Sequence, residues 1–276
     1  MITSTAVKEL RDKTNAGMMD CKKALEEAKG NIDQAIEILR KKGLSIAQKK
    51  SGRLAHEGIL GTHYNDNGKL GLIVEVNCET DFVVKTDDFQ KFVTQATDLV
   101  HNKAPKNIEE LQSSLQETVT SLIAKIGENI QVRRFARWEA KSPQEKIGFY
   151  LHAGSKIGVL TLVSDKDSKV DVNAAKEIAM HIAAMHPKYV RREEVPAEVV
   201  AKEKEIQAAN VDPKKPAAIR EKIVEGKLGK FYSEVCLEEQ VFVKDPEGKK
   251  TVRDWLKSQS PNARIEKFAR LQVGET

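Results

Sequence analysis

Long apolar runs are absent from this sequence. The apolar stretches are short, as in Leu72-Ile73-Val74, which a glutamate interrupts at once. A membrane-spanning helix needs roughly 18 or more such residues. The first residues, Met1-Ile2-Thr3-Ser4, do not form the charged and then apolar pattern of a signal peptide. We therefore expect no membrane association and a cytoplasmic location.

Cysteine is also scarce. The three cysteines, Cys21, Cys78 and Cys236, are odd in number and far apart. Neither a disulfide framework nor a Cys-x-x-Cys metal site can be built from them. Their number and spacing fit a reducing compartment.

A strong excess of one charge is missing too. The chain has 46 basic and 41 acidic residues, a net charge of +5, which is weaker than the bias of a nucleic-acid-binding tail.

Catalytic signatures are missing as well: the sequence has no Gly-x-Gly-x-x-Gly, no Walker-type lysine and no His-Glu-x-x-His. His181 and His186 are five residues apart, a poor spacing for a shared metal. We expect neither an enzyme nor a cofactor or metal site.

The first 54 residues predict a separate helical unit. Their apolar residues recur at helical spacing and indicate three short helices, the third with Asn31 and Gln34 as a capping box. Residues 40–53 then hold six basic residues and no acidic one. We interpret that stretch as a solvated linker and place a domain boundary near 54.

From residue 55 to 140 the pattern changes to strands and helices. Strands at 59–64 and 69–78 flank an Asn-Asp-Asn-Gly turn, which predicts a hairpin. The second strand alternates, so one apolar face is expected. A helix capped by Asp87, a helix near 107–126 and a strand near 130–138 follow. The corner at 82–84, between strand and helix, is predicted to be a loop.

The same order recurs in residues 141–276. Residues 156–160 (KIGVL) resemble residues 69–73 (KLGLI) at an offset of 87 (156 − 69). The second copy is longer by 46 residues (110 − 64, from the glycine of each strand to the phenylalanine of each Phe-Ala-Arg). We infer an α+β fold with a duplicated αβ unit and an insertion at about 188–232.

The insertion predicts two polar helices, at about 194–210 and 216–232. Their few apolar residues make a thin seam, and a helical hairpin of this kind is marginal alone. We expect it to project from the core. It would then either self-associate, as a homodimer or a 2:2 complex, or contact another protein.

Two long motifs resemble the elongation factor Ts family. They are residues 10–25 (LRDKTNAGMMDCKKAL) and 75–83 (EVNCETDFV), in the order and spacing of that family. Residues 126–129 (IGEN), 157–159 (IGV) and 224–226 (VEG) are similar to further family stretches. The resemblance spans nearly the whole chain. It implies a ubiquitin-associated-like N-terminal module, a core of two related αβ halves with antiparallel sheets, and a helical hairpin in the second half.

The resemblance also implies a function: binding elongation factor Tu, displacing its magnesium ion and releasing GDP. The partner-binding residues that it implies lie in three places. The first is the corner formed by Thr80, Asp81, Phe82 and Val83. The second is the N-terminal module, through Arg11, Met18 and Met19. The third is His152 in the second half.

The residues themselves support these assignments unevenly. Met18 is in line with Cys21 and Leu25, so helical spacing alone would place it in the module core, whereas Met19 would be more exposed. The second copy has Asp167-Ser168-Lys169 where the first has Thr80-Asp81-Phe82. The shared scaffold therefore does not require a phenylalanine at this corner.

Two other classes of function stay open at this stage. The basic 40–53 segment would suit a nucleic-acid-binding adaptor, although it lacks interleaved aromatic residues and no nucleic-acid partner is expected. Such an adaptor would bind with a steep salt dependence and would not need Phe82. An enzyme is disfavoured because no nucleophile and base are paired in the sequence.

Overall fold

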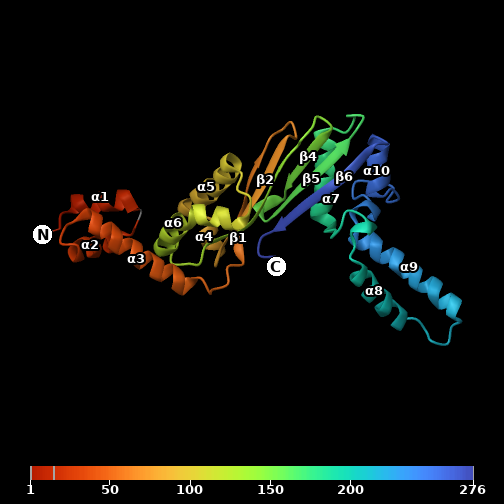
Figure 1. Cartoon of the computed structure of the whole chain (residues 1–276), viewed down its shortest axis with the longest axis horizontal. Coiled ribbons are helices and arrows are strands. Elements are labelled where there is room, and N and C mark those ends of the chain that lie inside the picture. Colours follow the sequence, from red (N-terminus) through yellow and green to blue (C-terminus); the bar gives the residue numbers. More distant parts are fainter. Residues whose placement is uncertain (1, 15, 276) are drawn as a thin grey trace.

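The computed structural model describes residues 2–14 and 16–275. Figure 1 shows an elongated arrangement: an N-terminal helical module at one end, two αβ halves in the middle and a projecting helical hairpin at the other end. The predicted boundaries at 54 and 140 fall in the segments before β1 (Glu57–Tyr64) and before β4 (Glu145–Leu151). The chain is thus a mixed α+β protein, as its sequence predicts.

The N-terminal module consists of α1 (Ser4–Thr14), α2 (Met18–Glu27) and the start of α3 (Ile32–Lys50). Its small core is built from one face of each helix and includes Leu10, Cys21, Leu25 and Ala35, all fully buried. Asn31 caps α3 by accepting a hydrogen bond from the backbone N–H of Gln34. This confirms the predicted start of the third helix.

The interpretation of residues 40–53 as a solvated linker is wrong. Helix α3 continues to Lys50 and crosses α6 of the first half (Figure 1). Gly43 is buried at this crossing and faces Thr120 and Ala124 of α6. Ile46 and Ala47 pack against the core of the first half. The N-terminal module is therefore joined to the core by a packed helix.

The first half is a three-stranded antiparallel sheet covered by helices. Its strands are β1 (Glu57–Tyr64), β2 (Leu70–Cys78) and β3 (Gln131–Glu139), in the order β1-β2-β3. Its helices are α4 (Asp81–Val84), α5 (Asp87–Lys103) and α6 (Ile108–Ile126). The hairpin and both long helices were predicted. The cap of α5 was misplaced by one residue: Thr86, not Asp87, accepts the hydrogen bond at its start.

The second half repeats this plan. Strands β4 (Glu145–Leu151), β5 (Ile157–Asp165) and β6 (Ala263–Gln272) form the sheet, and α7 (Val172–Met185) covers it. β5 begins 87 residues after β2 (157 − 70), which confirms the predicted duplication. The remaining elements are α10 (Val252–Gln259) and three short 3-10 turns, η1 (Ala153–Ser155), η2 (Arg192–Glu194) and η3 (Leu237–Glu239).

The predicted apolar face of β2 is confirmed, and it packs in the core of the first half. The opposite face, for which the alternation made no prediction of burial, is buried as well. Every residue of β2 is buried. One face packs on the helices of its own half, and Ile73 on the other face packs between the halves, against Leu60, Leu160 and Leu271. The polar residues Glu75 and Asn77 are buried on that face as well. The two sheets therefore share an interface that local alternation does not reveal.

The insertion is the helical hairpin of α8 (Ala197–Ala209) and α9 (Ala217–Val235). The thin seam is confirmed: Val211 and Val224 are buried, whereas Ile206 and Ile219 are about half exposed. The base is tied to the core, because the Val235 carbonyl accepts hydrogen bonds from the Lys188 and Tyr189 backbone N–H groups. The hairpin then projects from that base (Figure 1).

Candidate partner-binding site

The corner after β2 presents a phenylalanine to solvent. Residues 81–84 form one helical turn, α4, where a loop was predicted. Phe82 is 76% exposed, whereas the next two residues, Val83 and Val84, are buried in the core of the first half. A single turn thus anchors two apolar side chains and leaves the largest one outside. The ring of Phe82 therefore lies outside the packed core.

The other predicted residues of this corner have different roles. The hydroxyl of Thr80 donates a hydrogen bond to Glu128 Oε1 at 2.7 Å, so it holds the corner from inside. Asp81 is exposed and lies 3.4 Å from the Lys85 ammonium group. Val83 is an internal anchor. Asp81 and Phe82 are therefore the two members of the set whose side chains face solvent.

Cys78 lies directly beneath this corner. Its thiol donates a hydrogen bond to the Thr80 carbonyl oxygen at 3.1 Å. Burial raises the pKa of the Cys78 thiol to about 12. The thiol therefore stays protonated at neutral pH, and it serves as a packed hydrogen-bond donor and not as a nucleophile or a metal ligand.

The N-terminal module exposes its two adjacent methionines. Met18 is 47% exposed and Met19 is 64% exposed, at the start of α2. The interpretation of Met18 as a core residue is wrong, since Cys21 and Leu25 fill that face without it. Arg11, on α1, is also exposed. Flexible apolar side chains of this kind suit a protein-binding surface.

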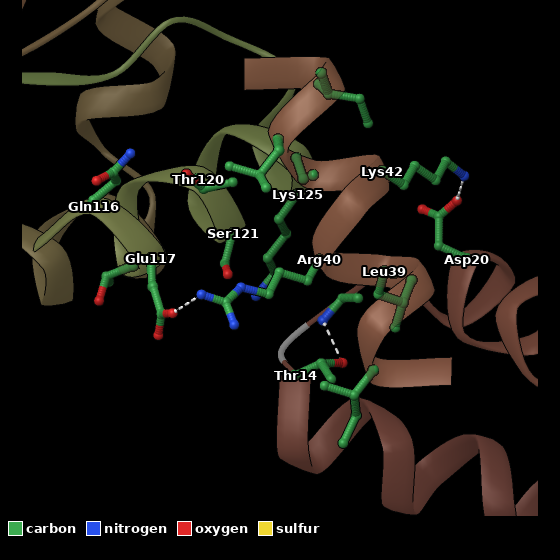
Figure 2. Close-up of a pocket in the computed structure, with 18 of the residues that line it drawn as sticks. Thr14, Asp20, Leu39, Arg40, Lys42, Gln116, Glu117, Thr120, Ser121 and Lys125 are labelled. Atoms are coloured by element: carbon green, nitrogen blue, oxygen red, sulfur yellow. Dashed lines mark hydrogen bonds and ion pairs between the residues drawn. The ribbon is translucent and has the colours of Figure 1, made fainter. Parts of the chain in front are cut away.

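A groove of about 860 Å³ lies where the N-terminal module meets α6. Figure 2 shows that two ion pairs border it, Arg40 with Glu117 across α3 and α6, and Lys42 with Asp20 across α3 and α2. Arg40 and Lys42 thus have acidic partners on neighbouring helices, and Lys41 pairs with Glu37 within α3. This pairing weakens the argument for an open nucleic-acid surface on this segment.

His152 lies in the second half, just after β4. It is exposed, and its Nδ1 lies 3.0 Å from the Tyr150 hydroxyl. His181, by contrast, is a buried core histidine: its Nε2 pairs with Gln240 Oε1 at 2.9 Å and its Nδ1 accepts from the Val243 N–H. The two histidines therefore belong to a surface and a core, respectively.

Across residues 2–14 and 16–275, no cluster of three or more His, Cys, Asp and Glu side chains is placed to hold a metal ion. In the same residues, no helix combines the length and apolarity needed to cross a membrane.

No role was predicted from the sequence for Glu128 and Asn129. Glu128 and Asn129 both contact the segment before α4. The signal was present, because they belong to the 126–129 motif, but the motif had no role in the sequence interpretation. Their contacts join segments about 50 residues apart, and pattern reasoning within one helix or strand does not reach that far.

Comparison with known proteins agrees with this arrangement. The sequence model of the family described as Elongation factor TS matches residues 79–275. Elongation factor Ts of Trichlorobacter lovleyi is 44% identical to this chain, over 99% of the chain and 93% of the relative. The proteins of the same name from Clostridium botulinum and Clostridioides difficile are 43% and 45% identical, over 100% and 99% of this chain and 94% and 93% of their own. The chain therefore belongs to the elongation factor Ts family of translation elongation factors.

Proposed function

We propose that this chain is a guanine nucleotide exchange factor for elongation factor Tu in the cytoplasm. It binds the GDP-bound GTPase and promotes GDP release, so that GTP can bind during translation elongation. Membership of the elongation factor Ts family supports this role. The observation that carries the proposal is the exposed ring of Phe82 on a corner whose neighbouring valines are buried.

The proposed mechanism is a wedge without a catalytic step. The corner sits on packed anchors, which give Phe82 a fixed place from which to push into an apolar cleft of the partner. Asp81 competes for polar groups beside the cleft. The partner's magnesium site loosens, and GDP affinity falls because the ion no longer offsets the charge of the phosphates.

Docking and opening are separate tasks in this scheme. Met18, Met19 and Arg11 dock the N-terminal module, and His152 contributes from the second half. Phe82 alone is responsible for the difference in affinity: it makes the factor bind the nucleotide-free GTPase more tightly than the GDP-bound GTPase. Thermodynamic linkage then makes nucleotide and factor weaken each other's binding by the same factor.

The direct test is release of fluorescent GDP from a Tu-type GTPase. Catalytic amounts of this chain, added with excess unlabelled GDP, are expected to accelerate the fluorescence loss in proportion to the factor added. Added EDTA should raise the factor-free rate and reduce the advantage of the factor, since both remove magnesium. Release at the spontaneous rate with a folded factor would refute the proposal.

A further inference from the structure

We propose that Glu128 is a positioning residue for Phe82, and that Asn129 ties the same corner to the segment after α3. This inference rests on the proposed exchange function and assigns a role to the 126–129 motif. Neither residue has to touch the partner. They fix the place from which the phenyl ring acts.

The carboxylate of Glu128 collects three hydrogen bonds from two consecutive residues. Its Oε2 accepts from the backbone N–H groups of Glu79 and Thr80, at 3.1 and 3.0 Å. Its Oε1 accepts from the Thr80 hydroxyl at 2.7 Å. Both oxygens are used, so the carboxylate fixes the orientation of the chain as well as its position.

These contacts matter because the buried anchors of α4, Val83 and Val84, both follow Phe82, so the chain before Phe82 needs support from elsewhere. Helix α4 spans only Asp81–Val84, and the N–H groups that precede a short helical turn have no partner within the turn. Glu128 supplies those partners from outside as charge-assisted hydrogen bonds, which are stronger than neutral ones. Phe82 is two residues beyond the anchored Thr80. The direction in which the Phe82 side chain points therefore depends on the hydrogen bonds between Glu128 and Thr80.

Asn129 extends the same junction in two directions. Its backbone N–H donates to Glu79 Oε1 at 2.7 Å, and its side-chain Nδ2 donates to the Arg53 carbonyl oxygen at 2.7 Å. Arg53 also pairs with Glu79 at 3.4 Å. The segment that follows α3 is thus held against the residue that precedes the anchored corner, and Asn129 is almost fully buried.

Gly127 explains how one short motif reaches both targets. It ends α6 with φ +84°, a left-handed conformation that favours glycine. The chain reverses there, so the next two residues turn back toward the end of β2. Helix α3, α6 and the Phe82 corner consequently meet at a single junction. Docking through the N-terminal module then fixes where Phe82 stands against the partner.

The test is a double-mutant cycle on the maximal rate of GDP release at saturating factor. Glu128→Gln removes the negative charge, so the Glu79 and Thr80 N–H groups donate to a neutral oxygen, while the NH₂ group faces the Thr80 hydroxyl oxygen. This variant should lower the maximal rate by about tenfold, the scale of losing one charge-assisted hydrogen bond. In a Phe82→Leu background, where a smaller apolar side chain keeps part of the stimulated release, it should have a smaller effect than in the parent. Affinity for the nucleotide-free partner should change less than the rate.

A matched control is Glu110→Gln. Glu110 likewise accepts a backbone N–H, from Lys106 at 2.9 Å, but at the start of α6. This variant should leave exchange unchanged. Thr80→Val, which removes the hydroxyl donor and keeps the side-chain shape, should slow release in the same direction as Glu128→Gln. It keeps the inference testable if Glu128→Gln does not fold.

The outcomes separate the two claims. If Phe82→Ala reduces release and both anchor variants exchange at the wild-type rate, the positioning role is wrong and the exchange function stands. An equal loss from Glu128→Gln in the parent and in the Phe82→Leu background would also overturn it, because the effect would not pass through the side chain of residue 82. Wild-type exchange by Phe82→Ala would overturn the wedge and the inference together.

Discussion

The carboxylate of Glu75, in the middle of β2, accepts a hydrogen bond of 3.0 Å from the backbone N–H of Gly274. Glu75 is fully buried, and its second oxygen accepts from Arg134 Nε at 2.6 Å. Gly274 has φ +79°, and a Cβ there would lie 2.5 Å from the His56 carbonyl oxygen. A buried charge therefore joins the first half of the core to the last described residues of the second.

Removing the partner of this charge should destabilise the whole core. Arg134→Ala leaves the Glu75 carboxylate buried without its cation, and we expect a loss of about 3 kcal/mol in the free energy of unfolding. Urea denaturation measures the change. The control is Arg40→Ala, which breaks an ion pair with Glu117 whose side chains are 67% and 79% exposed. That change should lower the free energy of unfolding by less than about 1 kcal/mol. Equal losses in the two variants would contradict the role of the buried ion pair.

The exposed methionines should contribute to docking and not to stability. Replacing Met18 and Met19 together by serine should weaken binding to elongation factor Tu by roughly tenfold or more, given the apolar area that docking would cover. The melting temperature should stay close to that of the parent. Met185→Ala is the control, since this methionine is 45% exposed but lies on α7 of the second half. Isothermal titration with both variants decides; similar affinities for the two would remove the docking role.

The hairpin should be dispensable for folding. We expect a Gly/Ser linker in place of residues 198–229 to change the stability of the core by less than about 1 kcal/mol, or about 2–4 °C in Tm. The replacement keeps the base, including Tyr232, whose ring lies 4.6 Å from the Arg192 guanidinium. Loss of a cooperative thermal transition would show that α8 and α9 belong to the core. Light scattering on the same pair of proteins reports whether the hairpin drives self-association.

Buried His181 should make stability depend on pH. Burial lowers the pKa of this histidine below its ordinary 6.5, and its Nδ1 accepts a backbone hydrogen bond that protonation would break. As pH falls through about 6.5, the unfolded chain takes up the proton first, so stability declines until the folded pKa is reached. His181→Gln should remove this part of the decline between about pH 7.5 and 5.5. Parallel Tm curves for the two proteins would contradict the prediction.

Local pattern predicted the elements well but not their burial. The β-hairpin, the helix start at Asn31 and the 87-residue repeat were predicted from turn chemistry and from spacing within short stretches of sequence, and all three are present in the structure. The second face of β2 could not be predicted, because its cover is the other half of the core. Residues 40–50 were predicted to be a solvated linker because they are rich in basic residues. The contact of Gly43 with α6 depends on the tertiary structure and has no local sequence signal.

The corner illustrates the same limit at the site. Its sequence favoured a contact role for Phe82, since the second copy has no phenylalanine at that position. Whether the ring pointed inward or outward depended on how Val83 and Val84 fill the core, a tertiary property. Glu128 belongs to a recognisable motif, but the sequence does not indicate its contacts, because the three groups that donate hydrogen bonds to it lie on a distant segment, at residues 79 and 80.

The most direct measurement is stimulated GDP release by Phe82→Ala, taken beside its melting temperature. Two variants bracket it. Phe89→Ala empties a fully buried site and should cost about 3–5 kcal/mol of stability. Leu54→Ala truncates a side chain that is as exposed as Phe82, 75% against 76%. This variant should keep both the melting temperature and the stimulated GDP release of the parent. The account predicts that Phe82→Ala melts like the parent and no longer accelerates GDP release. Normal melting together with normal GDP release would contradict it.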